Sequence, residues 1–166
     1  ELKKHYDKYK GFQVKKMNEL HIFRAFVYES LRYYVIFKSN IPRIIIDDNL
    51  KIGKYNIPKG AQVMSAPYNI MTNPDYFERP TEFYIEHFLD KDGRFKKSQY
   101  FVLFGYGKRD CVGQNLAIKE LFCVLSALLY RYKFSIPQEE KENWIIPESF
   151  MTFPTPNLPM IIVKRN

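Results

Sequence analysis

Hydrophobic residues recur at helical spacing in two long stretches of the chain. From Met17 to Phe37 an apolar residue returns every three or four positions, which predicts one long helix with a single buried stripe. From about Gln114 to Tyr130 a second helical pattern follows a glycine-rich loop. The chain also opens, at Glu1, inside a polar helical pattern. The apolar stripe of the first stretch consists of Leu20, Phe23, Val27, Leu31 and Tyr34.

Short apolar runs separated by turn residues fill the region after the first helix. Four of them, at 43–46, 50–52, 55–57 and 61–65, predict strands, with turns at 47–49 and 58–60. A short helix is expected at 69–71, and irregular chain from 76 to 100. The last segment, 149–163, is rich in proline and predicts a β-hairpin with broken edges. Because no repeat or linker divides the chain, we expect residues 1–166 to form one unit without an internal boundary.

The composition is that of a globular chain with a sizeable core. With 166 residues, of which 46% are hydrophobic and 27% charged, the chain has the length of one domain. No stretch is long and apolar enough to span a bilayer, and the first residues carry no signal-peptide pattern. Because the chain starts within a helical pattern, we expect it to be a piece of a longer protein.

The formal net charge of +8 points first to nucleic-acid binding. The lysine- and tyrosine-rich residues 3–10 add to that hypothesis, but no recognisable nucleic-acid-binding module follows them. A solvated helix end explains this start better, so we predict no nucleic-acid partner. A second basic group, which surrounds the cysteine loop, consists of Arg94, Lys96, Lys97, Lys108 and Lys119.

The two cysteines have different surroundings. Two cysteines make no disulfide framework, which is typical of a reducing compartment. Cys123 lies within the apolar run 121–125, so we expect a small core residue there. Cys111 lies in a loop that leads directly into the second helical pattern, at the positive end of the helix macrodipole, where a thiolate is favoured. The positive charges of Lys108 and Arg109 also favour the thiolate form of Cys111.

Three glycines make the backbone of the cysteine loop unusually adaptable. Gly105, Gly107 and Gly113 permit a tight turn and a close approach of the backbone to a flat ligand. A thiolate held in this way is suited to bind haem iron. The alternative is a buried cysteine in a glycine-rich loop that binds nothing.

The order Phe-x-x-Gly-x-Arg-x-Cys-x-Gly in this loop resembles the haem-binding signature of the cytochrome P450 family at every position. The resemblance implies haem b (iron protoporphyrin IX) as the cofactor and Cys111 as the axial ligand of its iron. It implies that Arg109 pairs with a haem propionate and that Phe104 packs beside the thiolate. Gly113 would let the following helix start close to the porphyrin.

A carboxylate and a guanidinium three residues apart, Glu29 and Arg32, can pair on one face of the first helix. Alone this is a routine surface pair, but its place ahead of the strands and the cysteine loop resembles the family's Glu-x-x-Arg motif. A buried charge pair requires further hydrogen bonds, so a third partner is expected. The family supplies it from Pro-x-x-Phe-x-Pro-Glu-Arg-Phe. Residues 80–88 match that pattern except that Ile85 replaces a proline and His87 replaces the arginine.

His87 can still donate a hydrogen bond to Glu29, although it has fewer donors than arginine and can lose its charge near neutral pH. The resulting structural triad would be Glu29, Arg32 and His87. The alternative for His87 is a partly exposed residue in a loop.

Family resemblance assigns four further residues. Arg43 stands where the family often places a basic residue that faces a haem propionate, although Pro42-Arg43 can equally open a strand. Phe37, Ile41 and Phe150 fall in segments that line the substrate pocket in relatives. Core packing is the alternative for these three.

The order of the predicted elements resembles the C-terminal part of the cytochrome P450 fold from about Met17 onward. That part comprises helix K, a small β-sheet, a meander, the cysteine loop, helix L and a terminal β-hairpin. The resemblance therefore implies a mixed α and β, mainly helical structure. The family's oxygen-activating acid–alcohol pair, its N-terminal anchor and its helix C haem contacts have no counterpart in this sequence.

The resemblance implies the haem-binding segment of a haem-thiolate monooxygenase, which inserts one oxygen atom from dioxygen into a lipophilic small molecule. We expect the segment alone to be inactive, because the distal oxygen-activating helix is absent. A truncated, catalytically silent family member and a haem-binding module without oxygenase activity are the alternatives.

Family resemblance also implies an electron-donating partner. A reductase, either a flavoprotein or a ferredoxin, would dock at the basic face near Lys96, Lys97, Lys108 and Lys119. A full-length relative would lie at the cytosolic face of the endoplasmic reticulum membrane.

Overall fold

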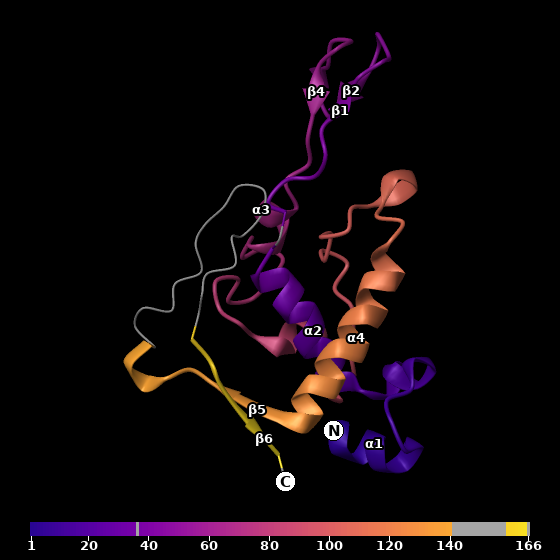
Figure 1. Cartoon of the computed structure of the whole chain (residues 1–166). Coiled ribbons are helices and arrows are strands. Elements are labelled where there is room, and N and C mark those ends of the chain that lie inside the picture. The colour runs from indigo at the N-terminus through magenta and orange to yellow at the C-terminus, as the bar shows by residue number, and fades with distance from the viewer. Residues whose placement is uncertain (36, 141–158, 166) are drawn as a thin grey trace.

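Two helices that pack against each other form the centre of the computed structural model, which describes residues 1–35, 37–140 and 159–165. These are α2 (His21–Tyr33) and α4 (Gln114–Arg131), and Figure 1 shows α4 lying across α2. The rings of Phe23 on α2 and Phe122 on α4 meet at 5.9 Å between centroids. Small antiparallel sheets lie at the periphery of this pair (Figure 1). The architecture is therefore a mixed α/β one with a helical centre.

The first helix, α1 (Leu2–Tyr9), and the 3₁₀ helix η1 (Val14–Glu19) pack near the C-terminal end of α4. Tyr6 stacks on Tyr130 with ring centroids 4.3 Å apart. His5 is buried between the rings of Tyr9, Phe12 and Phe122. Aromatic contacts thus fix the basic start of the chain to α4.

The prediction of one helix from Met17 to Phe37 was wrong at both ends. The chain leaves helical geometry at Leu20, with φ −97° and ψ 79°, and again at Tyr34. Leu20 turns its side chain into the core, where it is fully buried. The carboxylate of Glu1 accepts hydrogen bonds from the amides of Ile22 and Phe23, which satisfies the first turn of α2. A tertiary contact, rather than local pattern, therefore sets the start of α2.

The four predicted strands exist, but all of them are shorter than predicted. β1 (Arg43–Ile44) pairs with β4 (Gln62–Val63), and β2 (Lys51–Ile52) pairs with β3 (Tyr55–Asn56), both antiparallel. Their residues are mostly exposed, and Figure 1 shows the two ribbons projecting from the helical centre. Without a covering layer little apolar area is buried, so only short ladders form.

The terminal hairpin differs from the prediction. β6 (Ile161–Lys164) pairs antiparallel with β5 (Tyr132–Ser135), a strand that follows α4 directly and that the sequence pattern did not predict. Residues 149–158 of the predicted hairpin lie outside the described residues. The shorter elements are α3 (Pro67–Met71), η2 (Ile85–Phe88), η3 (Gly107–Arg109) and η4 (Gln138–Glu140).

The core consists of two hydrophobic clusters, one on each side of α2. The first surrounds Phe88, which is fully buried, and the second joins α2 to Phe122 of α4. Cys123 belongs to neither cluster, because it is exposed, so its assignment to the core was wrong. Phe122 and Ser126 mark the buried face of α4, and the next residue after Phe122 is turned about 100° away on a helix.

Candidate functional site

The cysteine loop closes on itself through its backbone. The amide of Cys111 donates to the carbonyl of Phe104 at 2.7 Å, which joins the two ends of the loop. Gly105 and Gly107 have φ values of +83° and +78°, a region that side chains with a Cβ rarely adopt. Phe104 packs on the first core cluster, with its ring 6.2 Å from that of Phe101. The loop is therefore a tight turn anchored to the core by one aromatic ring.

Cys111 lies immediately before α4, and its side chain is exposed. Its carbonyl accepts the amide of Gln114, the first residue of the helix, at 3.2 Å. Gly113, the N-cap residue, has φ −85°, so its backbone does not require glycine. A Cβ at Gly113 would lie 3.8 Å from the Cys111 Sγ, in ordinary van der Waals contact. Because Gly113 has no side chain, this space beside the thiol stays unfilled.

The surroundings of the thiol fit a flat, apolar ligand that carries a metal and carboxylates. Val112 and Leu116 present exposed aliphatic side chains next to Cys111. Lys108 and Arg109 are also exposed, and among the described residues no carboxylate pairs with either cation. Sulfur, aliphatic surface and free cations are the donor set that haem requires from its proximal side.

The connection between α2 and β1 runs beside the cysteine loop. A Cβ at Gly105 would lie 3.9 Å from the Nδ2 of Asn40. Asn40 itself is bound to Ser65 through both its amide and its side chain, at 2.9 and 2.8 Å. Arg43 follows three residues later on β1, with an exposed side chain. The fold thus brings the Arg43 segment toward the loop of Arg109, although their side chains make no mutual contact among the interactions described.

The residues expected to line a substrate pocket are placed differently from core residues. Phe37 and Ile41 are 49% and 74% exposed, which excludes core packing against the described residues as the reason for their hydrophobicity. Phe150 lies outside the described residues. The lining role of all three stays a prediction.

Glu29 and Arg32 form a fully buried ion pair on α2. Both side chains are 0% exposed, and the guanidinium binds the carboxylate through two hydrogen bonds of 2.8 and 2.7 Å. Arg32 directs its remaining donors to backbone carbonyls of the segments that follow the strands. These acceptors are Met71, Pro80 and Glu82, at 2.8–2.9 Å. Because every donor direction is used, the pair connects α2 rigidly to residues 71–82.

His87 is the third member of this network. Its Nδ1 lies 3.0 Å from the Glu29 carboxylate, and its Nε2 faces the carbonyl of Glu78. The side chain is only 3% exposed, so the alternative of a partly exposed loop histidine does not apply. A carbonyl can only accept, and the carboxylate is bound to Arg32. The geometry therefore suits the imidazolium form, in which both nitrogens donate.

Glu29 is held in its charged form by these neighbours. Burial by itself would raise the pKa of Glu29, but the hydrogen bonds from Arg32, from His87 and from the amide of Tyr84 outweigh burial. The pKa of Glu29 is consequently lower than its ordinary value. The sequence pattern indicated a third partner, but it carried no signal for the Tyr84 amide or for the carbonyl acceptors, because any residue type supplies those groups.

The family model for cytochrome P450 matches residues 1–162. The chain belongs to the cytochrome P450 family. It is 35% identical over 148 residues to cytochrome P450 2L1 of Panulirus argus, a match that covers 89% of this chain and 30% of that protein. It is 39% identical over 123 residues to cytochrome P450 2C23 of Rattus norvegicus, covering 74% of this chain and 25% of the relative.

A third relative, cytochrome P450 2C44 of Mus musculus, is 38% identical over 135 residues, covering 81% of this chain and 26% of the relative. The chain therefore spans less than a third of the length of these relatives, and it corresponds to a partial P450. Haem and iron binding and monooxygenase chemistry are properties of the family. Within the part of the chain that the structure describes, no helix is both long and apolar enough to cross a membrane.

Proposed function

We propose that this chain is the C-terminal, haem-binding segment of a haem-thiolate monooxygenase, with no internal domain boundary. In this assignment α2 corresponds to helix K, α4 to helix L, and residues 72–100 to the meander. The observation that carries the proposal is the exposed Cys111 thiol, which a closed loop holds at the start of α4 beside a glycine that leaves it open.

Different residues of the chain would contact different parts of haem b. Cys111 would bind the iron through its sulfur, and the N-terminus of α4 would favour the thiolate. Arg109, and Arg43 from the neighbouring segment, would pair with the propionates. Phe104 would keep the loop seated on the core. When bound, haem would supply the redox chemistry that inserts one oxygen atom from dioxygen into a lipophilic small molecule.

The network of Glu29, Arg32 and His87 would serve this site by fixing its scaffold. It joins α2 to residues 71–87, which precede the cysteine loop in the chain. All three side chains are enclosed, so none of them would touch the substrate. Their contribution is to stability and to haem incorporation.

Two further assignments follow from family membership. The exposed lysines Lys96, Lys97, Lys108 and Lys119 would form a basic face on which an acidic electron donor, a flavoprotein or a ferredoxin, docks. The full-length protein would work at the cytosolic face of the endoplasmic reticulum membrane, with a lipophilic small molecule as substrate. No role in nucleic-acid binding is proposed.

Haem titration and turnover separate this proposal from its two alternatives. The longer protein that contains this segment should take up one haem per chain and form product from a lipophilic substrate when a reductase is added. Haem uptake without product at any substrate tested would favour a haem-binding module. Failure to take up haem would favour a catalytically silent family member.

A further inference from the structure

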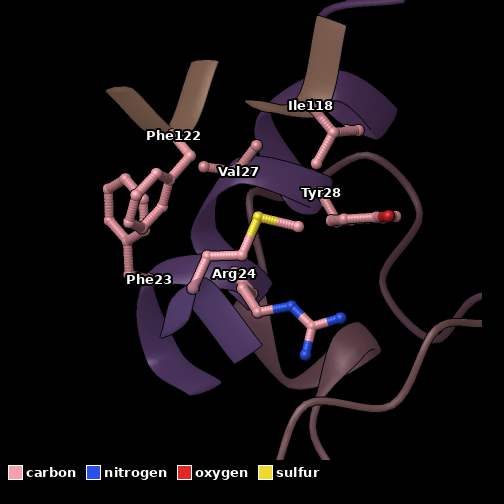
Figure 2. A pocket seen from close by; sticks show the side chains of 7 residues that line it. Phe23, Arg24, Val27, Tyr28, Ile118 and Phe122 are labelled. Carbon is pink, nitrogen blue, oxygen red and sulfur yellow. The ribbon is translucent and has the colours of Figure 1, made fainter. Parts of the chain in front are cut away.

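Arg24 is a half-buried cation without an anionic partner among the described residues. It projects from α2, and its guanidinium carbon lies 3.9 Å from the centre of the Phe95 ring. Among the described residues, no carboxylate or carbonyl accepts a hydrogen bond from the guanidinium. In Figure 2 the guanidinium points away from the rings of Phe23 and Phe122. An arginine stacked in this way is oriented but still has its donors available.

Neighbouring segments hold the stacked pair in place. Nδ1 of His21, at the start of α2, accepts the amide of Phe95 at 3.2 Å. The next amide, that of Lys96, donates to the carbonyl of Phe88 at 2.9 Å. Phe88 is fully buried, so the segment that carries the Phe95 ring is anchored to the core. The orientation of Arg24 is therefore fixed before any partner arrives.

Arg24 lies between the two halves of the basic face. On one side, Phe95 is followed by the exposed Lys96 and Lys97. On the other side, Arg24 and Ile118 of α4 line the same small cavity of about 30 Å³, and the exposed Lys119 follows Ile118 (Figure 2). Lys96, Lys97 and Lys119 are exposed, and the Lys97 ammonium lies 5.7 Å from the centre of the Phe101 ring. Arg24 is half-buried and stacks more closely, 3.9 Å from the centre of the Phe95 ring.

Such a cation has more to gain from a carboxylate than a solvated lysine has. Burial lowers the pKa of the Arg24 guanidinium, which means that the cation has lost part of its hydration without a compensating anion. A carboxylate would accept two parallel hydrogen bonds from the planar fork. Because stacking already fixes the side chain, little conformational freedom is lost when the partner binds. Interface anchors of this kind are enriched in arginine and lie near the centre of the contact.

We infer that Arg24 is the central anchor of the basic face and donates hydrogen bonds to a carboxylate side chain of an acidic, electron-donating protein. The inference rests on the docking partner proposed above and adds the residue that fixes the complex. The lysines then provide long-range attraction, while Arg24 provides the specific contact that slows dissociation.

The test compares matched arginine substitutions in this chain. The variants are Arg24→Gln, Arg24→Lys, and Arg131→Gln as a control with the same charge change at the exposed far end of α4. A double variant, Lys96→Gln with Lys97→Gln, tests whether the basic face contributes to affinity at all. Affinity for the isolated FMN domain of a diflavin reductase is measured at low ionic strength, with circular dichroism to check folding.

We expect Arg24→Gln to weaken binding by about tenfold or more, and Arg131→Gln by less than about twofold. Arg24→Lys keeps the charge but loses the fork, so it should weaken binding by about threefold. If Arg24→Gln does not fold, the affinity of Arg24→Lys alone tests whether Arg24 is the anchor.

Each of the remaining outcomes counts against the inference in a distinct way. Wild-type affinity in Arg24→Gln or Arg24→Lys, with weaker binding in the double lysine variant, would overturn the anchor but leave the docking face intact. Unchanged affinity in all variants would show that the docking face itself is wrong. If Arg24→Gln and Arg131→Gln weakened binding equally, Arg24 would contribute only through the net charge of the chain and would not be an anchor.

Discussion

Replacing Glu29 by glutamine is the sharpest perturbation of the buried network. The substitution keeps the size and shape of the side chain but removes its charge and one acceptor oxygen. In the native chain the two carboxylate oxygens accept from Arg32 twice, from His87 and from the Tyr84 amide. A glutamine would turn an NH₂ group toward some of these donors. Arg32 would then remain buried without its counter-charge.

The expected cost is large compared with the total stability of the fold. Removing one partner of a buried pair costs about 3–5 kcal/mol, against a total free energy of unfolding of about 5–15 kcal/mol. With a urea slope of about 2 kcal/mol per molar, the unfolding midpoint should fall by about 1.5–2.5 M. The lowered pKa of Glu29 also means that the native pair stabilises the fold above the ordinary carboxyl pKa of about 4.3 and loses this contribution as pH falls through the lowered value.

Urea unfolding at neutral pH, followed by circular dichroism, measures this cost. Glu86→Gln is the matched control, because Glu86 is an exposed carboxylate on the same 3₁₀ helix as His87. The control should unfold at the wild-type midpoint. If Glu29→Gln also unfolded at that midpoint, the network would contribute nothing measurable and the scaffold argument would fail.

Three other predictions concern the two buried histidines and the isolated segment. Burial lowers the pKa of His5, so the folded chain disfavours the charged form of this residue and stability should fall as pH drops below about 6.5. In His5→Phe the melting temperature should therefore depend less on pH between 7.5 and 5.5. If the melting temperature of His5→Phe depended on pH as steeply as that of the wild type, His5 would not be the source of this dependence. Because both nitrogens of His87 face acceptors, His87→Arg should keep or raise the melting temperature, whereas a distinctly lower one would show that arginine does not fit. Residues 1–166 mixed with haem, reductase and lipophilic substrates should give no hydroxylated product, because the sequence supplies no oxygen-activating pair; coupled turnover would refute this.

Local pattern was sufficient for the parts of the fold that depend on neighbours in sequence. The helix predicted from about Gln114 to Tyr130 matches α4, because its apolar spacing and the preceding glycine loop are both local signals. Glu29 and Arg32 are three residues apart, so their pairing follows from helix geometry. The positions of Gly105 and Gly107 in tight turns likewise follow from residue type.

Features that depend on distant contacts could not be predicted in this way. The start of α2 is fixed by Glu1, some twenty residues upstream, and β5 pairs with a strand beyond residue 158. Cys123 was misassigned for a different reason: its sequence neighbours 121–125 are apolar, but Lys119 and Glu120, one helical turn earlier, lie on its face of α4. Arg24 carries no motif, and its partial burial together with its close stacking on Phe95, at 3.9 Å, becomes visible only in the folded chain.

The spectrum of the reduced, carbon-monoxide-bound protein tests the central claim most directly. In the haem-loaded protein that contains this segment, the wild type and Cys123→Ala should both show the red-shifted Soret band of thiolate ligation. Both cysteines are exposed in the segment, so the two alanine variants are well matched. Cys111→Ala should lose the red-shifted band. If this band persisted in Cys111→Ala, Cys111 would not be the axial ligand and the proposed function would lose its basis.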